Sequence, residues 1–527
     1  MADPVTDDMR DPKTPASVQI RAEARAPITD PTLGRAVPAA AGSARHRLVT
    51  LGDSVTQGFQ SGAIYATDLS FPRIIAREMG WSDQFRYPRY AGPGGLPVNI
   101  EYVVRRLESE FGDKINWWEA ASAAFSLRSV MDEIEDYWER GPGSQVPKVS
   151  GIHHNLAVYG WDLRDAMSRT TARCLEAIAS PKDDWLAQIV EDHNDRAALR
   201  VLPPITTANP AGSSMLSAAE ALGNDGGIET LIVFLGANNA LSAVVDLKVV
   251  WSREGSGGTR DYQDLEKKKA FTVWDPAHFV VELDELVTRV KKIKAQRVIW
   301  ATVPHITVVP IARGVASKVA PGSRYFPYYT RPWIRDDQFA VEDDPNITAN
   351  EARAIDSAID QYNDAIVDRI GKARDNNLDW LIIDVAGILD RLAYRRYIDD
   401  VEARPAWWSE YPLPEPLRRL SPGLDSRFFH SGAGGRTQGG LFSLDGVHPT
   451  TVTYGILAQE FIDVMQRAQV PFFRGDGKTP RLDRVTVDFE RLIAVDTLIS
   501  DPPASLSSDL NLIGWLDQTV DLFRRLF

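Results

Sequence analysis

The stretch Arg47-Leu-Val-Thr-Leu51, which ends at Gly52, decides how this chain can fold. It is a short apolar run with β-branched residues, closed by a glycine and followed by helix signals, and such a run predicts a buried strand. Similar apolar runs occur at 154–158, 229–235, 297–302 and 380–385, accompanied by amphipathic helical patterns at 276–294, 349–374 and 450–467. Apolar strands that alternate with helices are typical of a parallel sheet covered on both faces. We therefore predict an α/β fold: a three-layer α/β/α domain with a parallel sheet, large insertions and a helical C-terminal extension.

The same pattern sets the predicted domain boundaries. Residues 1–45 are rich in Pro, Ala, Asp and Arg, and this composition predicts a disordered N-terminal tail. Residues 46–470 contain the predicted strands and form the α/β domain. Three long regions without strand signals, about 81–148, 161–227 and 304–348, are predicted to be functional insertions or lids. Residues 471–527 are predicted to be a linker followed by the helical extension.

Composition narrows the class of protein. The chain has 527 residues, 44% of them apolar and 25% charged, as in soluble globular proteins. Its net charge of −13 argues against a general attraction to nucleic acids or anionic membranes. Cys174 is the only cysteine, so no intrachain disulfide can form. The N-terminus lacks an apolar signal-peptide core, and no window reaches the roughly 18 apolar residues of a membrane span. We expect a cytoplasmic protein with no transmembrane segment and no nucleic-acid partner.

The run Gly52-Asp53-Ser54 directly follows the first predicted strand. A serine at a strand-to-helix turn presents its hydroxyl at the carboxyl end of the sheet, where α/β proteins bind ligands. Backbone N–H groups at the start of the next helix can stabilise negative charge there. The alternative interpretation is an Asp/Ser turn that only caps a helix.

Asp445 and His448 lie just before the last helix predicted for the α/β domain. A carboxylate three residues before a histidine can hold the imidazole in one tautomer for acid–base chemistry. The alternative is a structural histidine in a turn. Asp275 and His278 have the same spacing, but there we predict that Asp275 caps a helix with Pro276 at its first position.

The run Phe234-Leu-Gly-Ala-Asn238-Asn239 ends another apolar strand. The carboxamide of Asn238 could donate to an oxyanion, as side-chain amides do in several acyl-transfer sites. Ordinary turn chemistry between a strand and a helix explains the run equally well.

In this order along the chain, the Gly-Asp-Ser, Gly-x-Asn and Asp-x-x-His runs resemble the SGNH hydrolases, also called GDSL esterases and lipases. The resemblance covers about residues 47–470 and is concentrated in a few short blocks. It implies the flavodoxin-like α/β fold of that family, with Ser54 as nucleophile, His448 as base and Asp445 orienting the base. It also implies an oxyanion hole built from the Ser54 N–H, the Asn238 side chain and the N–H of a glycine.

We assign that glycine to Gly160, which ends the run Asn155-Leu-Ala-Val-Tyr-Gly160 and is similar to the family's second block. Three other glycines are alternative candidates: Gly92, Gly94 and Gly95. Asn239 stands where the family usually has aspartate, at a position outside the triad. The insertions make the chain much longer than a minimal member, which leaves the substrate open.

The resemblance implies a serine carboxyl-ester hydrolase, an esterase or lipase that acts on an acyl or acetyl ester through an acyl-enzyme intermediate. Neither a metal nor a cofactor is expected. Two alternatives remain open: an SGNH-like binding or scaffold module with little turnover, and an acyltransferase that uses the same site. The amphipathic end of the chain, 509–527, is a candidate for contact with a protein or a membrane surface, although packing onto its own chain is the simpler interpretation.

Overall fold

The computed structural model describes residues 6–38, 42–116, 118–147, 150–178, 189–506, 514 and 524–525. The chain divides into two compact units. Unit 1 consists of Met1–His46, Trp161–Ser168 and Gly223–Pro412. Unit 2 consists of Arg47–Gly160, Arg169–Leu222 and Leu413–Phe527.

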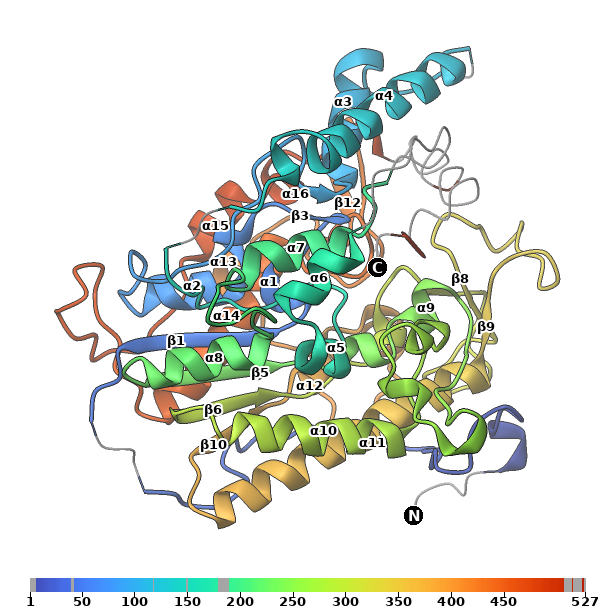
Figure 1. Ribbon diagram of the computed structural model, residues 1–527. Helices are drawn as coiled ribbons and strands as arrows, with labels where there is room; N and C mark the ends of the chain where they lie inside the picture. Colours follow the sequence, from blue (N-terminus) through green and yellow to red (C-terminus); the bar gives the residue numbers. More distant parts are fainter. Residues whose placement is uncertain are drawn as a thin grey trace. The chain divides into compact units, whose positions relative to one another are not determined.

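A parallel sheet of four strands in the order β1-β5-β6-β10, flanked by helices, confirms the predicted three-layer α/β fold (Figure 1). The strands are β1 (His46–Gly52), β5 (Ile228–Phe234), β6 (Ala295–Ala301) and β10 (Trp380–Ile383). In the parallel pairing of β5, β6 and β10, Val298 of β6 lies opposite Leu231 on one side and Trp380 on the other. Most residues of these strands are buried on both faces, which is why the sequence shows continuous apolar runs rather than alternation.

The run 154–158, predicted to be a further strand, is not a regular one. It lies alongside β1 with a single parallel bridge, between Thr50 and Asn155. The N–H of Val158 donates to the Gly52 carbonyl further along. The Asn155 side chain accepts the N–H of Ala157 at 3.2 Å, so a side chain satisfies a backbone donor that another strand would otherwise pair with.

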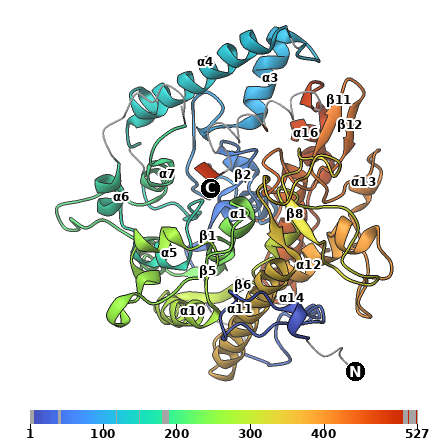
Figure 2. The same ribbon diagram turned by 90° about the vertical axis from the view of Figure 1, so that its right-hand side faces the viewer.

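Unit 1 contains the helices that pack on β6 and β10, together with a small antiparallel sheet. Its elements are α5 (Leu163–Ser168), α9 (Ser242–Val245), α10 (Pro276–Val290), α11 (Ala349–Asp375), α12 (Val385–Leu392), β7 (Arg313–Gly314), β8 (Tyr328–Thr330) and β9 (Ile347–Thr348). Helices α10 and α11 lie side by side in Figures 1 and 2, and the rings of Phe279 and Tyr362 stack between them with centroids 4.0 Å apart. Helix α11 begins at a capping box formed by Thr348 and Glu351.

The structure differs from the predicted disordered tail over residues 6–38, which pack along unit 1. Val18 is fully buried. Arg25 Nη1 contacts both carboxylate oxygens of Asp384, at 2.9 and 3.2 Å, and Ile28 donates its N–H to the same carboxylate at 2.7 Å. This stretch is anchored mainly by polar contacts to residues more than 300 positions away, which a prediction based on low hydrophobicity does not detect.

Unit 2 surrounds the end of β1. Its helices are α1 (Ser54–Gln57), α2 (Phe71–Glu78), α3 (Ile100–Phe111), α4 (Ala120–Glu139), α6 (Thr171–Ala177), α7 (His193–Val201), α13 (Glu415–Arg418), α14 (Thr451–Arg467), α15 (Phe489–Val495) and α16 (Thr497–Ser500), and α8 (Met215–Asn224) runs from unit 2 into unit 1. Its short strands are β2 (Phe59–Gln60), β3 (Ala63–Ile64), β4 (Leu96–Pro97), β11 (His430–Gly432) and β12 (Gly435–Gln438). Helices α2 and α14 pack through the parallel rings of Phe71 and Phe461, whose centroids are 4.9 Å apart. Helix α14, which begins three residues after His448, thus packs within the same unit as Ser54.

The predicted C-terminal extension is only partly described. Residues 474–480, near the start of the predicted linker and extension, form a tight turn in which the Asp476 carboxylate accepts the N–H groups of Lys478 and Thr479. Helices α15 and α16 follow it. The amphipathic stretch 509–527 lies outside the described residues except for residues 514, 524 and 525.

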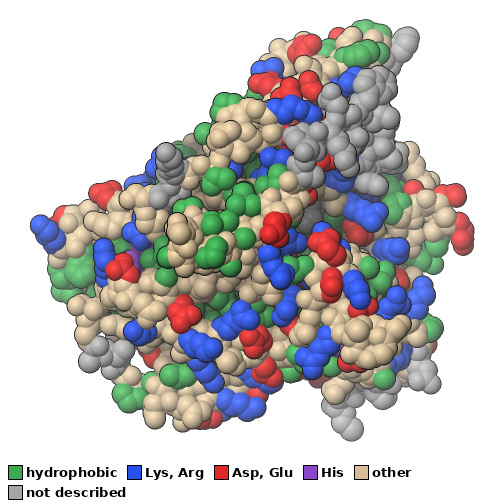
Figure 3. Space-filling model, viewed as in Figure 1, with side chains coloured by type: hydrophobic (Ala, Val, Ile, Leu, Met, Phe, Trp, Pro, Cys, Tyr) green, Lys and Arg blue, Asp and Glu red, His purple; other side chains and the backbone are tan. Residues whose placement is uncertain are grey.

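Within the described ranges, none of the helices combines the length and the apolar character of a membrane span. In the same ranges, no three His, Cys, Asp or Glu side chains are grouped so that they could hold a metal ion. On the face drawn in Figure 3, basic and acidic side chains are intermixed rather than gathered into separate regions.

Candidate active site

Ser54 is the first residue of α1 and directly follows β1, as the sequence predicted for a strand-to-helix turn. A side chain at Gly52 would collide with Thr56, because a Cβ built there lies 2.1 Å from Thr56 Oγ1. Asp53 caps the helix by accepting the N–H of Val55 at 3.2 Å. Gly58, with a φ of +97°, ends the helix after one turn and donates its N–H to the Ser54 carbonyl. The Gly-Asp-Ser run therefore forms a tight turn with Ser54, which is 5% exposed, at its apex.

Helix α1 is tied to the chain that leads to Gly160. Asn155 Nδ2 donates to the Thr56 carbonyl at 2.9 Å, and the N–H of Tyr159 donates to Gln57 Oε1 at 2.8 Å. Gly160 follows Tyr159 with a φ of +74°, a left-handed conformation that favours glycine. These hydrogen bonds hold the residue before Gly160 against the last residue of the helix that Ser54 begins.

The alternative glycines have other neighbours. A Cβ at Gly92 would meet the ring of Tyr137, and one at Gly94 would meet the ring of Tyr102. A Cβ at Gly95 would meet the carbonyl of Ile64 on β3. Their conformations are explained by packing around β3, α3 and α4.

Asp445 and His448 form a buried pair. Asp445 Oδ2 lies 3.0 Å from His448 Nδ1, and both side chains are at most 1% exposed. Asp445 Oδ1 accepts the N–H groups of Val447 and His448, each at 2.8 Å, and Oδ2 also accepts the N–H of Gly62 at 2.9 Å. Four donors thus converge on one carboxylate, and they fix its orientation.

This environment determines which imidazole nitrogen carries the proton. Burial alone would raise the pKa of Asp445, but the charge of His448 and the hydrogen bonds from His448 and Val447 outweigh burial and hold that pKa below its ordinary value. Asp445 is therefore ionised and can only accept, so Nδ1 of His448 carries the hydrogen. In the neutral imidazole the lone pair is then on Nε2, the nitrogen that a general base needs.

The turn between β2 and β3 links the Asp445 loop to the chain that follows α1. Ser61 and Gly62 both have positive φ angles, as a two-residue hairpin requires. The N–H of Ser61 donates to Ser443 Oγ at 2.8 Å, and the N–H of Leu444 donates to Ser61 Oγ at 3.3 Å. Our sequence reasoning missed Ser61 and Gly62, although a Ser-Gly pair between two short apolar segments is a recognisable hairpin signal.

Two aromatic residues complete this part of unit 2. The ring of Phe59 lies 4.6 Å from the imidazole of His448, between centroids. Tyr454 on α14 donates its hydroxyl to the Phe59 carbonyl at 2.7 Å. Burial raises the pKa of that hydroxyl, and the nearby carboxyl groups of Asp445 and Asp53 raise it further. Asp53, the neighbour of Ser54, and Asp445 therefore lie within electrostatic reach of one hydroxyl.

Asn238 belongs to unit 1, unlike Ser54, Gly160 and the Asp445–His448 pair. It lies in the turn after β5, and its Nδ2 donates to the Trp161 carbonyl at 2.9 Å. Its role as an oxyanion donor stays a prediction. The neighbouring Asn239 is fully buried, and its Oδ1 accepts the N–H of Leu163 at 3.3 Å, so this side chain supports the local turn.

Comparisons with known proteins add nothing to this assignment. A scan against protein-family models, a search of curated proteins and a search of solved structures each found no match. The resemblance to the SGNH hydrolases therefore rests on the short sequence blocks alone.

The second Asp-x-x-His run has a different arrangement. Asp275 caps α10 by accepting the N–H of Ala277 at 2.8 Å, as predicted. Its other carboxylate oxygen accepts the hydroxyl of Ser17 at 2.5 Å. His278 Nδ1 contacts Ser252 Oγ at 2.8 Å instead of a carboxylate. Ser252 and His278 are therefore matched controls for the Ser54 site.

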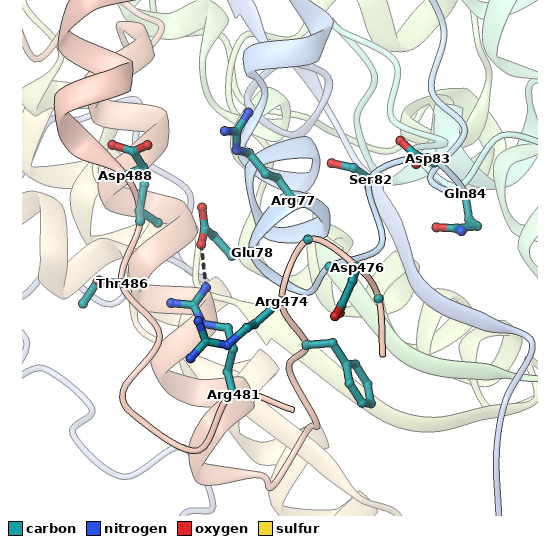
Figure 4. Close-up of a pocket in the computed structure, with 15 residues that line it drawn as sticks. Arg77, Glu78, Ser82, Asp83, Gln84, Arg474, Asp476, Arg481, Thr486 and Asp488 are labelled. Carbon is teal, nitrogen blue, oxygen red and sulfur yellow. Dashed lines mark hydrogen bonds and ion pairs between the residues drawn. The ribbon is translucent and has the colours of Figure 1, made fainter. Parts of the chain in front are cut away.

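A separate polar hollow of about 690 Å³ lies in unit 2, away from these residues (Figure 4). Arg77 and Glu78 from α2 line one part of it, and Arg474 and Arg481 line another. Glu78 and Arg481 form an ion pair at 2.9 Å in its lining. Both acidic and basic side chains line the hollow, and none of the predicted site residues does.

Replacing Asp53 by asparagine is expected to stabilise the protein at pH 8 and to change little at pH 4. Burial raises the pKa of Asp53 to about 7, against the opposing effect of its backbone hydrogen bonds. Among the described residues, none pairs with its Oδ2, so the oxygen opposite the cap is suited to carry a proton. Because this folded-state pKa is higher than the unfolded one, the contribution of Asp53 to stability is present below about pH 4 and is lost as the pH rises through about 7.

Asparagine keeps the cap without this loss, so the variant should gain about 2–4 kcal/mol over the wild type at pH 8. Urea titrations at pH 4 and pH 8 measure the difference, with the exposed Asp68→Asn variant as control. A gain of equal size at both pH values would contradict the assigned protonation.

Proposed function

We propose that this protein is a serine carboxyl-ester hydrolase of the SGNH type, with Ser54 as nucleophile, His448 as base and Asp445 orienting the base. The observation that carries the proposal is the buried Asp445–His448 pair, hydrogen-bonded through Gly62 to the turn that follows the Ser54 helix. A histidine that only filled a turn would not need an ionised carboxylate held by four donors.

The reaction follows from these roles. His448 Nε2 removes the proton of the Ser54 hydroxyl as its oxygen attacks the ester carbonyl. The tetrahedral oxyanion accepts hydrogen bonds from the N–H groups of Ser54 and Gly160 and from the Asn238 side chain. His448 then protonates the departing alcohol, and an acyl group remains on Ser54. Water, activated by His448, attacks the acyl carbonyl and releases the carboxylic acid.

Two observations support Gly160 as the glycine donor. The hydrogen bond from Tyr159 to Gln57 joins Gly160's neighbour directly to α1. The alternative glycines instead contact β3 and tyrosines of α3 and α4. The substrate remains an acyl or acetyl ester of unassigned length, and the cytoplasmic location expected from the sequence stays a prediction.

Hydrolysis of p-nitrophenyl esters with acyl chains of two to twelve carbons tests the proposal. We expect turnover of at least part of the series, and we expect a fluorophosphonate probe to label a single peptide that contains Ser54. The Ser252→Ala variant should be labelled like the wild type. Absence of both turnover and labelling would favour a binding or scaffold module. Labelling with acyl transfer to an added alcohol, in preference to water, would favour an acyltransferase.

A further inference from the structure

A cavity of about 980 Å³ in unit 1 is separate from every residue assigned above. Residues from four parts of the chain line it. They lie in the N-terminal stretch (8–9 and 22–24) and within 319–328, 348–353 and 402–407. Two arginines reach it although they are almost completely buried, Arg324 with 9% and Arg353 with 7% of their surface exposed. A cavity of this volume is large enough for a small organic molecule.

Three buried acids of unit 1, Asp356, Asp360 and Asp390, have cationic partners. His305 lies between Asp390 and Asp360, with ring nitrogens 3.1 and 3.2 Å from their carboxylate oxygens. Burial lowers the pKa of His305, but the surrounding carboxylates outweigh burial and raise it to about 10, so the imidazole is charged. Arg396 pairs with Asp356 at 3.0 Å. These carboxylates are therefore engaged by His305 and Arg396.

Arg324 and Arg353 have no such partner. Neither forms an ion pair with a carboxylate in the part of the chain that the structure describes. Arg324 donates from Nε to the Tyr325 hydroxyl at 3.0 Å. Arg353 donates from Nη1 to the Met9 carbonyl at 3.1 Å and to Asn350 Oδ1 at 2.9 Å. Within the described ranges, the remaining guanidinium N–H groups of both arginines make no hydrogen bond.

The two charges also lie close together. The guanidinium carbons of Arg324 and Arg353 are 5.1 and 4.9 Å from the centroid of the same ring, that of Tyr325. Burial lowers the pKa of Arg353, and the charge of Arg324 acts in the same direction. Burial also lowers the pKa of Arg324, but Tyr325, Tyr397 and the carboxylate of Asp356 outweigh burial and raise it. Asp8 acts in the same raising direction on Arg353, although neither arginine forms an ion pair within the described ranges. An anion that enters the cavity can accept the N–H groups of both arginines that contacts within the described part of the chain leave unused, since Arg324 uses Nε and Arg353 uses Nη1 for those contacts.

We propose that this cavity binds a small organic carboxylate, with its anionic group on Arg324 and Arg353. A guanidinium group donates two parallel hydrogen bonds to a carboxylate, and two neighbouring guanidinium groups can share one. Tyr328 and Trp407 line the same cavity and offer aromatic surface to the body of the ligand. This inference does not rest on the proposed esterase activity.

The acidic residues at the rim of the cavity favour a ligand with one negative charge over a ligand with several. Asp8, Glu23 and Glu402 line it and are exposed. These acids would repel a ligand with several negative charges, whereas a monoanion can be neutralised by the arginines alone. The geometry therefore points to a monocarboxylate rather than to a polyphosphate.

Calorimetric titration of the full-length protein with benzoate, octanoate and inorganic phosphate tests the inference. We expect one of the carboxylates to bind more tightly than phosphate, and Arg324→Met and Arg353→Met each to weaken that binding by about 10- to 100-fold. The control Arg335→Met removes an exposed arginine outside the cavity and should bind like the wild type.

A further variant keeps the test valid if the arginine variants fail to fold. Ala320→Trp places an indole in the cavity from an exposed position on its wall, without touching the arginine contacts, and should also abolish binding. No binding of either carboxylate by the wild type up to about 10 mM would overturn the proposal. Binding that survives in Ala320→Trp, or phosphate binding that is tighter than carboxylate binding, would also overturn it.

Discussion

Replacing Ser54 by alanine is expected to lower kcat for ester hydrolysis by about four to six orders of magnitude. The change removes the oxygen that forms the acyl-enzyme bond and leaves the turn intact. The Asp53 side chain accepts the Val55 N–H and the Gly58 N–H donates to the residue-54 carbonyl, and neither contact involves the hydroxyl. Substrate binding should persist, so KM should change far less than kcat. Steady-state rates on the best p-nitrophenyl ester measure both constants.

The Ser252→Ala variant is the matched control for this experiment. Ser252 is buried, and its Oγ lies 2.8 Å from Nδ1 of His278, as a nucleophile would lie from its base. In the described residues, however, this Nδ1 contacts the serine instead of a carboxylate. Its activity should remain within a few-fold of the wild type. A Ser54→Ala protein that keeps its activity would refute the proposed mechanism, even if the wild type hydrolyses esters.

The second large effect is expected for Asp445→Asn, which should lower kcat about ten-thousand-fold. The new amide group must replace one of the two oxygens, and each oxygen accepts two N–H donors. The less costly orientation places the amide opposite His448, because the imidazole can change its tautomer whereas the backbone donors of Val447 and His448 cannot. The hydrogen then lies on Nε2, and His448 can no longer accept the Ser54 proton.

The same substitution leaves the N–H of Gly62 without its acceptor, so the variant should also lose about 1–3 kcal/mol of stability. ¹⁵N NMR of His448 reports the tautomer, and a thermal melt reports the stability. Asp275→Asn is the control, since it has the same spacing to a histidine but no contact with a catalytic group. A variant with an unchanged tautomer and full activity would show that Asp445 does not orient the base.

The regular part of the fold was predictable because its signals are local. Apolar runs such as 229–235 and 297–302 became β5 and β6, and Asp275 and Pro276 began α10 as predicted. These signals depend on neighbouring residues, whose backbone preferences and caps act within a few positions. The run 154–158 does not form a regular strand. Its Asn155 side chain accepts the N–H of Ala157, which a neighbouring strand would otherwise bind.

The ordered N-terminal stretch shows where composition fails. Residues 6–38 contain few large apolar side chains, so they resemble a disordered segment. Their order comes from particular partners, such as Asp384 for Arg25 and Ile28. A sequence does not reveal such pairs, because any of the many carboxylates in the chain could serve.

By itself, the sequence determined the α/β class, the turn that carries Ser54 and the spacing that brings Asp445 to His448. Each of these depends on residues close together in the chain. Only the tertiary structure decided that Gly62, 383 positions away, completes the shell of Asp445, and that Arg324 and Arg353 remain as cations without a carboxylate partner among the described residues. The physical reason is that burial and charge balance depend on which distant segments pack together.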